Sequence, residues 1–476
     1  MNLKQMLRAL SILLLIGLLN ACGGGGGSGT SGGGAKSTGV VTGIGSVFVN
    51  GVEFDSASAK VSIDDDQNRS ESDIKVGMVV SVTGSVNDDH VTGTAQSIEF
   101  DGELVGPVAA APVISAGGGS FTVMGQTVIV DSMTLFDNAT GLADITAGVV
   151  VEVSGLRDAS GQIHATRIEV NHPAATGFQV KGTISNLTTT TFMIGTLTVN
   201  FANATQINFP DAGLSNGLFV KVKSSAAPVN NVLIASSVKV RPASIEVQER
   251  DHEELEGFVA GLSGSSFTVN GQAVLVNAQT VFENGTMATL ANNVRVEIEG
   301  SIASGVLVAT KVEFRLAADV RIEAQVTQID LAGGTITVFG NPGIVVKVPA
   351  NTTQLRDEDD NPVRAFNLKN VAVGDRVAIV GIKGSANTVT ATRLERTKAS
   401  LQVVLRGPLD SAVSPTLVIL GVHINTGAAT VFTGSDEASL TQAAFFGLAS
   451  AGTTVKASGT FDGMAIAATA ASLGGD

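Results

Sequence analysis

Hydrophobic and polar residues alternate along many short stretches of the chain. In residues 294–300, with the sequence VRVEIEG, valine and isoleucine alternate with arginine and glutamate. A period of two places one face of a β-strand in the core and the other in water. The β-branched side chains favour the same conformation. After residue 21 the sequence has no comparable helical period, so the pattern predicts an all-β chain.

The strand pattern recurs as a repeat with short anchors. The copy that begins at Gly257 reads GFV, then SFTVNG, then VRVEIEG, then VATKV, and the copy that begins at Gly106 has matching segments in the same order. The glycine that closes the second anchor occurs six times, at Gly51, Gly125, Gly195, Gly271, Gly340 and Gly421. Self-similarity of this kind indicates six copies of one unit.

Each copy supplies about five short strands, a number that suits a small closed barrel because closure removes exposed strand edges. We therefore predict a tandem array of about six five-stranded, OB-like β-barrels, with a small sandwich as the alternative. The Asn-Gly pairs at 50–51 and 270–271 predict tight hairpin turns, since both residues adopt positive φ readily. We expect extended beads joined by short linkers.

The anchors also set the expected boundaries of the repeats. They are 38–101, 102–172, 173–243, 257–317, 318–398 and 399–476. The interval 244–256 contains six acidic residues. A run of charge is usually solvated, so we predict an acidic linker there.

The order Gly-x-Val, Phe-Thr-Val-x-Gly, Val-Gly-x-x-Val-x-Val-x-Gly and Ala-Thr-Arg-Ile resembles the bacterial repeat domain catalogued as domain of unknown function 5666. The resemblance covers nearly all of residues 38–472. It implies tandem repeats in an exported or lipid-anchored protein. It implies no activity and no catalytic residues.

The first residues have the pattern of an export signal. Lys4 and Arg8 precede a mainly apolar stretch of eleven residues, 9–19, which is too short to span a bilayer. The next residues, Leu-Asn-Ala-Cys, resemble the lipobox of bacterial lipoproteins, which implies cleavage of a signal peptide (1–21) between Ala21 and Cys22 and lipidation of Cys22. Residues 22–37 are expected to form a flexible Gly/Ser tether. A lone buried cysteine is the alternative.

These features predict a lipid anchor in the cell envelope, at the outer membrane, with the membrane face left open. Composition adds exclusions. The net charge is −14, and the chain contains neither Trp nor Tyr. Nucleic-acid binding is not expected. An acidic chain repels phosphates, and without Trp or Tyr this chain lacks the aromatic platforms on which bases stack.

Candidate chemistry is sparse. Five histidines fall at unrelated places in different copies, and no catalytic motif accompanies them, so we do not expect an enzyme. Two acidic loops have the alternate spacing of oxygen ligands that can surround Ca²⁺; their residues are Asp64, Asp66 and Asn68, and Asp357, Asp359 and Asn361. The rest of an EF-hand is missing, and solvated turns are the alternative. No cofactor other than this candidate Ca²⁺ is predicted.

The sequence thus favours a lipid-anchored, non-enzymatic repeat protein of the cell envelope. It would act as a scaffold, a spacer or a binding module for an unidentified envelope protein. The alternative is an accessory surface lipoprotein that binds a cation or a polymer through its acidic loops.

Overall fold

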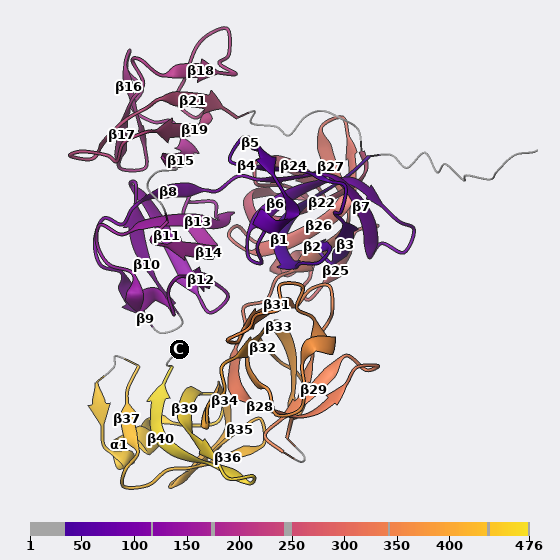
Figure 1. Ribbon diagram of the computed structural model, residues 1–476, viewed down its shortest axis with the longest axis vertical. Coiled ribbons are helices and arrows are strands. Elements are labelled where there is room, and N and C mark those ends of the chain that lie inside the picture. The colour runs from indigo at the N-terminus through magenta and orange to yellow at the C-terminus, as the bar shows by residue number, and fades with distance from the viewer. Residues whose placement is uncertain are drawn as a thin grey trace, which may run out of the picture. The chain divides into compact units, whose positions relative to one another are not determined.

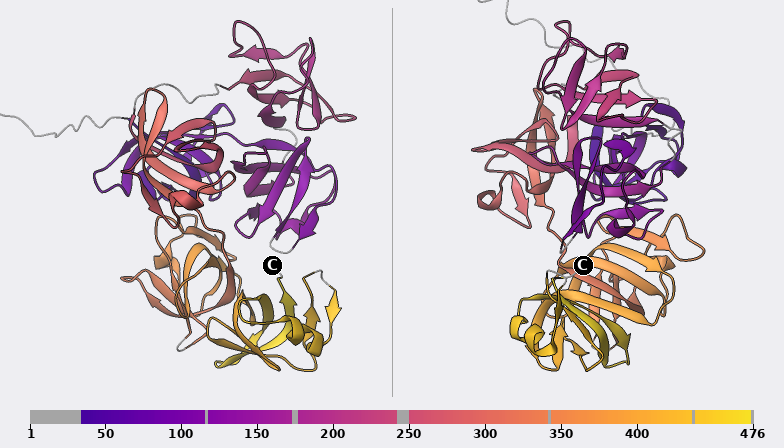
Figure 2. Two further views of the ribbon diagram at one scale, coloured as in Figure 1. Left: turned by 180° about the vertical axis from the view of Figure 1, so that it is seen from behind. Right: turned by 90° about the vertical axis from the view of Figure 1, so that its left-hand side faces the viewer.

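The computed structural model describes residues 34–115, 118–172, 177–241, 250–340, 343–435 and 438–474 (Figure 1). The described residues form 40 β-strands, one short α-helix and four 3-10 helices. The strands fall into six consecutive groups, one for each repeat, which can be followed by colour in Figures 1 and 2. The all-β prediction is confirmed.

The first three repeats contain strands β1 to β21. Repeat 1 comprises β1 (Ala35–Gly43), β2 (Val47–Val49), β3 (Val52–Asp55), β4 (Lys60–Ile63), β5 (Asp66–Arg69), η1 (Glu71–Asp73), β6 (Val79–Val86) and β7 (Thr92–Phe100). Repeat 2 comprises β8 (Leu104–Pro107), β9 (Val113–Ser115), β10 (Gly118–Val123), β11 (Gln126–Asp131), β12 (Leu135–Asp137), η2 (Leu142–Asp144), β13 (Val150–Arg157) and β14 (Ile163–Val170). Repeat 3 comprises β15 (Phe178–Thr183), β16 (Thr191–Ile194), β17 (Leu197–Asn200), β18 (Thr205–Ile207), β19 (Phe219–Ser224), β20 (Val232–Ile234) and β21 (Ser237–Val240).

The last three repeats contain strands β22 to β40. Repeat 4 comprises β22 (Arg250–Ser263), β23 (Ser266–Val269), β24 (Gln272–Leu275), β25 (Val281–Glu283), η4 (Met287–Thr289), β26 (Arg295–Ala303) and β27 (Val306–Phe314). Repeat 5 comprises β28 (Val320–Asp330), β29 (Thr335–Val338), β30 (Ile344–Lys347), β31 (Gln354–Glu358), η5 (Leu368–Asn370), β32 (Arg376–Lys383) and β33 (Thr388–Thr397). Repeat 6 comprises β34 (Gln402–Val413), β35 (Thr416–Ile419), β36 (Val422–Asn425), β37 (Val431–Thr433), β38 (Ser439–Leu440), α1 (Gln442–Leu448), β39 (Thr454–Phe461) and β40 (Ala465–Leu473).

Each repeat closes into a small barrel by the same strand order. In repeat 4, β22, β23 and β24 pair antiparallel, β24 pairs parallel with β27, and β26 lies antiparallel between β27 and β22. Repeats 1, 5 and 6 close in the same way. Single bridges, Val108 to Val123 and Ser185 to Met193, contribute to closure in repeats 2 and 3. The OB-like barrel is therefore correct, and the sandwich alternative is not.

The predicted Asn-Gly hairpins are confirmed. The asparagine side chain of the turn also explains why a second position of the repeat, Gly39 in the first copy, is glycine. Asn50 and Gly51 have φ of 50° and 83°, and Asn270 and Gly271 have φ of 49° and 83°, the left-handed values that such a turn requires. The amide of Asn50 then donates to the carbonyl of Thr38 in β1 at 3.1 Å. A Cβ on the neighbouring Gly39 would collide with the Asn50 side chain.

The glycine that ends the third anchor marks a bulge. The register of the last two barrel strands shifts at Gly84, Gly155, Gly300, Gly381 and Gly459. At each of these positions a Cβ would meet a backbone carbonyl oxygen of the opposite strand far inside van der Waals contact. Bulges of this kind bend a strand and increase its twist, which helps a short sheet to close. The repeated glycine is therefore a requirement of the backbone.

The first strands of the barrels pair with one another. Strand β1 runs parallel to β22, joining repeats 1 and 4, with Ala35 opposite His252 and Thr38 opposite Leu255. Strand β8 pairs antiparallel with β15, joining repeats 2 and 3, and β28 pairs antiparallel with β34, joining repeats 5 and 6. We call these contacts, with the side chains beside them, the 1–4, 2–3 and 5–6 seams. The prediction of extended beads is wrong, because strands of different repeats share sheets.

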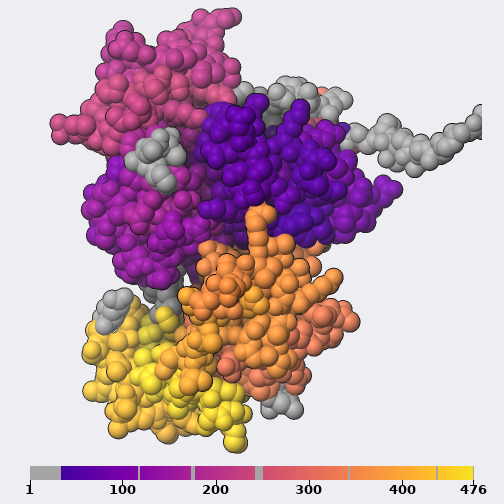
Figure 3. Space-filling view, viewed as in Figure 1, coloured from indigo at the N-terminus to yellow at the C-terminus, as the bar shows by residue number. Residues whose placement is uncertain are grey.

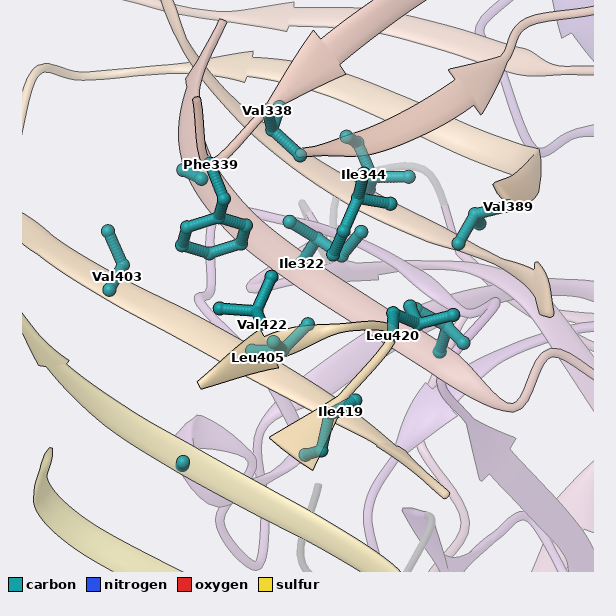
Figure 4. Close-up of a cluster of buried hydrophobic side chains, with 14 of the residues drawn as sticks. Ile322, Val338, Phe339, Ile344, Val389, Val403, Leu405, Ile419, Leu420 and Val422 are labelled. Atoms are coloured by element: carbon teal, nitrogen blue, oxygen red, sulfur yellow. The ribbon is translucent and has the colours of Figure 1, made fainter. Parts of the chain in front are cut away.

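The hydrophobic cores follow the seams. One continuous cluster of buried side chains covers repeats 5 and 6, and Figure 4 shows part of it, with Ile322 and Phe339 of repeat 5 beside Leu405 and Leu420 of repeat 6. A second continuous cluster covers repeats 2 and 3. Repeats 1 and 4 keep separate cores. Fused cores add the stability that a barrel of about seventy residues lacks by itself.

Candidate functional site

The acidic segment before repeat 4 belongs to the 1–4 seam. Residues 250–256 form the first half of β22, so the prediction of a solvated linker is wrong for them; residues 244–249 lie outside the described residues. Glu253, Glu254 and Glu256 are buried. Glu256 accepts hydrogen bonds from the backbone N–H of Val40 and from Arg295, both at 3.0 Å. The Glu256 carboxylate therefore makes one contact between repeats 1 and 4, with Val40, and one contact within repeat 4, with Arg295.

The loop at Asp64 and Asp65 contacts a basic face of repeat 3. Asp65 Oδ2 lies 2.7 Å from Lys221 Nζ and 3.0 Å from Lys223 Nζ, and Oδ1 lies 2.9 Å from Lys239 Nζ. Partial burial favours a raised pKa for Asp65, but the three lysines outweigh it and hold the pKa well below its usual value. The ionised carboxylate is thus part of a contact between repeats 1 and 3.

The other members of the first predicted calcium loop have protein partners. Asp64 Oδ1 accepts hydrogen bonds from the Gly102 backbone N–H and from Gln179 Nε2, both at 3.0 Å. Asp66 accepts from the backbone N–H of Asn68 at 3.0 Å and pairs with Arg69. Calcium binding here stays a prediction.

The second acidic loop holds an ion pair. The side chain of Asp357 is 0% exposed and pairs with Arg396 through both carboxylate oxygens. It also accepts from the backbone N–H groups of Asp359 and Val363. Burial acts to raise the pKa of Asp357, but these donors lower it below its usual value. Asn361 is exposed, and calcium binding at this loop also stays a prediction.

Sequence reasoning missed a His–Glu cluster in repeat 2. Nδ1 of His172 lies 3.2 Å from Glu152 Oε2 and 3.7 Å from Glu169 Oε1. Burial, reinforced by the nearby Asp64 carboxylate, raises the pKa of Glu152 to about 7. The hydrogen bond with Glu169 raises the pKa of His172, and the same bond lowers that of Glu169 to about 2. Local sequence offered no signal that these groups meet.

Two further histidines meet at the 1–4 seam. The rings of His90 and His252 have centroids 6.0 Å apart. His252 Nε2 lies 2.9 Å from Glu254 Oε1, and His90 Nδ1 lies 3.6 Å from Glu299 Oε1. These residues are distant in sequence, and the pairing of β1 with β22 brings their repeats together.

Repeat 5 also contacts repeats 1 and 2. The Thr42 hydroxyl donates to the carbonyl of Asn351 at 2.9 Å, and the Asn351 amide donates to the Gly51 carbonyl at 2.8 Å. Atoms of these repeats touch where indigo meets orange in Figure 3. Arg356 Nη2 lies 2.7 Å from Asp137 Oδ1 of repeat 2. Contacts between repeats therefore extend beyond the paired first strands.

A cavity of about 550 Å³ opens at the 5–6 seam. Its lining includes the rings of Phe339 and Phe461, which lie edge to face at 5.2 Å, and the carboxylate of Asp410. Asp410 pairs with Lys383 at 2.7 Å. An apolar hollow with a few polar groups at its rim has the general character of a ligand site.

The predicted cleavage and lipidation residues, Ala21 and Cys22, lie outside the described residues. In the part of the chain that the structure describes, no helix has the length and apolar character needed to cross a bilayer.

One comparison with known proteins, to a family model, shows the repeat architecture. No curated protein matches the chain. A solved structure titled "drosophila Unr CSD456" is 16% identical, covers 46% of this chain and 97% of that chain, and has a TM-score of 0.12. A family model described as "Domain of unknown function (DUF5666)" matches six segments, 38–99, 105–169, 181–239, 256–313, 323–395 and 406–470. The matched segments make up most of the chain, which therefore belongs to the DUF5666 family as an array of six copies.

Proposed function

We propose that this protein is a non-enzymatic, lipid-anchored scaffold of the bacterial cell envelope, on which partner proteins assemble. The observation that carries the proposal is the buried charge between repeats. Lys221 of repeat 3 is 1% exposed and lies between Asp65 and Asp101 of repeat 1. A buried charge is costly unless its partners are held in place, so this contact favours one arrangement of the two repeats. A fixed array of barrels suits a scaffold.

The arrangement of titratable groups supports a non-enzymatic role. Glu152 and His172, whose pKa values are raised, contact each other and Glu169. Such groups also occur in structural ion-pair networks.

The N-terminal sequence supports the location. The lipobox-like sequence ending at Cys22 and the glycine-rich stretch after it suit a protein tethered to a membrane. A single acyl chain gives marginal anchoring, whereas the two chains of the diacylglycerol expected on Cys22 would hold the barrels at the membrane surface.

The second candidate is an accessory lipoprotein that binds a cation or a polymer. The cavity beside Phe339 and Asp410 favours it, since a polymer segment could enter there. The acidic loops give weaker support, because protein donors already hold Asp64 and Asp357.

Two measurements test the proposal. Radiolabelled palmitate should enter the wild-type protein in cells and should not enter a Cys22→Ser variant; a wild-type protein without label contradicts the anchor. Cross-linking in intact cells, followed by affinity purification from the envelope, should recover a partner at fixed stoichiometry with or without a calcium chelator. Recovery of no protein contradicts the scaffold, and recovery only with calcium favours the second candidate.

A further inference from the structure

Three metal-ligating side chains from two repeats converge at the 1–4 seam. His90 lies in the turn between β6 and β7 of repeat 1, whereas His252 in β22 and Glu299 in β26 belong to repeat 4. One ligand atom from each of the three lies within 4.8 Å of the other two. The parallel pairing of β1 with β22 begins at His252, which lies opposite Ala35, so the backbone itself fixes this meeting point.

We propose that His90, His252 and Glu299 bind one Zn²⁺ ion, which ties repeat 1 to repeat 4. Two imidazoles and one carboxylate are a common protein donor set for Zn²⁺ and leave a fourth position for water or another ligand. Nitrogen donors select a transition metal over Ca²⁺, which prefers oxygen. This site is therefore distinct in chemistry and place from the acidic loops at Asp64 and Asp357.

The surroundings of His252 suit a metal ligand. Its Nε2 lies 2.9 Å from Glu254 Oε1, and Glu254 is buried. In metal sites a carboxylate commonly accepts the hydrogen bond of the ring nitrogen that does not bind the ion, which fixes the ring and raises its basicity. Glu254 thus acts as a positioning residue for the His252 ring.

The position of His90 gives the ion a route from solvent. The side chain of His90 is 66% exposed. Its turn is held by Asp89, which accepts hydrogen bonds from the backbone N–H groups of Val91 and Thr92 at 3.0 and 2.9 Å. His90 itself has φ of 57°. The turn is therefore ordered while its imidazole stays reachable.

Protons compete with the metal ion for His252, and Lys311 competes with it for Glu299. Lys311 Nζ lies 3.7 Å from Glu299 Oε2, while Oε1 faces His90. Burial opposes the charged form of His252, but the hydrogen bond with Glu254 and the charges of Glu299 and Glu253 outweigh it and raise the His252 pKa. A ligating imidazole must lose its proton, so Zn²⁺ affinity should fall as the pH falls.

Calorimetric titration of the full chain with Zn²⁺ alone, after chelator treatment, tests the site. A Cys22→Ser background removes the thiol as a competing ligand. At pH 7.5 we expect one ion per chain, and at least tenfold weaker binding in His90→Gln and in Glu299→Gln. His423→Gln, at an exposed position in β36, and His172→Gln, in the other His–Glu cluster, should bind as the parent does. Binding should weaken at pH 5.5.

A second readout identifies the ligands. Co²⁺ in place of Zn²⁺ should give visible absorption typical of a four-coordinate site in the parent and lose it in His90→Gln. Because the side chain of His90 is exposed, its substitution should leave the fold intact, and an unchanged circular dichroism spectrum checks this. No Zn²⁺ binding by the parent, or parental affinity in His90→Gln, overturns the proposal. The strand pairing of β1 with β22 needs no metal, so this failure would leave the scaffold proposal standing.

Discussion

Lys221 Nζ of the third repeat lies 2.7 Å from Asp101 Oδ1 of the first repeat. The same carboxylate pairs with Arg241 and lies 3.5 Å from Lys181 Nζ. Three cations of repeat 3 therefore share one carboxylate of repeat 1. Because Lys221 and Lys181 are buried, the loss of Asp101 would leave them without full compensation.

Asp101→Asn should accordingly lower the free energy of unfolding by about 3 kcal/mol, the lower end of the cost of breaking a buried ion pair. Asp66→Asn is the matched control, because Asp66 lies on the neighbouring hairpin and its contacts, with the exposed Arg69 and the Asn68 backbone N–H, stay within that hairpin; its effect should stay within about 0.5 kcal/mol. Urea denaturation of the full chain measures both. Equal effects of the two substitutions would contradict a buried network between repeats 1 and 3.

Acid should weaken the contact between repeats 1 and 3, to which Asp65 also contributes. The pKa of Asp65 lies well below its usual value of 3.8 in the folded chain. A group with a depressed folded pKa stabilises above the unfolded value, and that stabilisation is lost as the pH falls below it. We expect melting temperatures of the wild type to fall below pH 4 more steeply than those of Asp65→Asn. Parallel curves for the two proteins would show that Asp65 is not coupled to folding.

The His–Glu cluster of Glu152, Glu169 and His172 should make stability depend on pH in the opposite direction, so that stability falls as the pH rises near neutrality. Burial and the nearby Asp64 raise the pKa of Glu152 to about 7, and contact with Glu169 raises that of His172; Lys75 acts on Glu152 in the opposite direction. Both raised values mean that the folded state binds more protons, so this contribution to stability is present at pH 5 and is lost as the pH rises through 7.

Glu152→Gln should therefore remove part of the difference in stability between pH 5 and pH 8, by up to about 3 kcal/mol, because the pKa of Glu152 rises from 4.5 to about 7 and each pKa unit above pH 5 is worth about 1.4 kcal/mol. Denaturation midpoints at the two pH values measure the effect. His423→Gln is the control, because His423 lies on the exposed face of β36. An unchanged pH dependence in Glu152→Gln would refute the raised pKa.

The bulge glycines give a prediction about the barrel itself. A Cβ at Gly459 would collide with the carbonyl of Ala467, whereas a Cβ at Gly427 of the same repeat would meet no atom within 4 Å. Gly459→Ala should destabilise repeat 6 by roughly 2 kcal/mol or more, because the backbone must move. Gly427→Ala should change stability by less than about 1 kcal/mol. Thermal unfolding of both variants compares them, and similar melting temperatures would contradict a strict need for glycine at the bulge.

Local patterns were enough to predict the barrels. Alternation in residues 294–300 and the Asn-Gly pairs report on strands and turns within one repeat, where the residues that interact are close in sequence. The short helix α1 was missed. It has only seven residues and begins after Thr441, whose hydroxyl accepts from the Ala444 N–H. About two helical turns leave too little periodicity to detect.

The seams could not be predicted from the sequence. The acidic run at 250–256 has the same composition whether it is solvated or buried, and only the partners of Glu256, Val40 and Arg295, decide between the two. The sequence likewise gives no sign that His90 and His252 meet, because they belong to different repeats. Contacts between distant segments depend on which barrel edges meet, and a repeat that resembles its neighbours carries little information about that choice.

The most direct test of the account is a cross-link across the 1–4 seam. Lys36 lies opposite Glu253 in the parallel pairing of β1 with β22, and directly opposite residues of neighbouring strands are close enough for a disulfide. In a Cys22→Ser background, Lys36→Cys combined with Glu253→Cys should form an intramolecular disulfide under mild oxidation, seen as a shift on a non-reducing gel. Lys36→Cys combined with His423→Cys should stay reduced. If both pairs stay reduced, or both oxidise equally, repeats 1 and 4 do not share a sheet and the scaffold loses its structural basis.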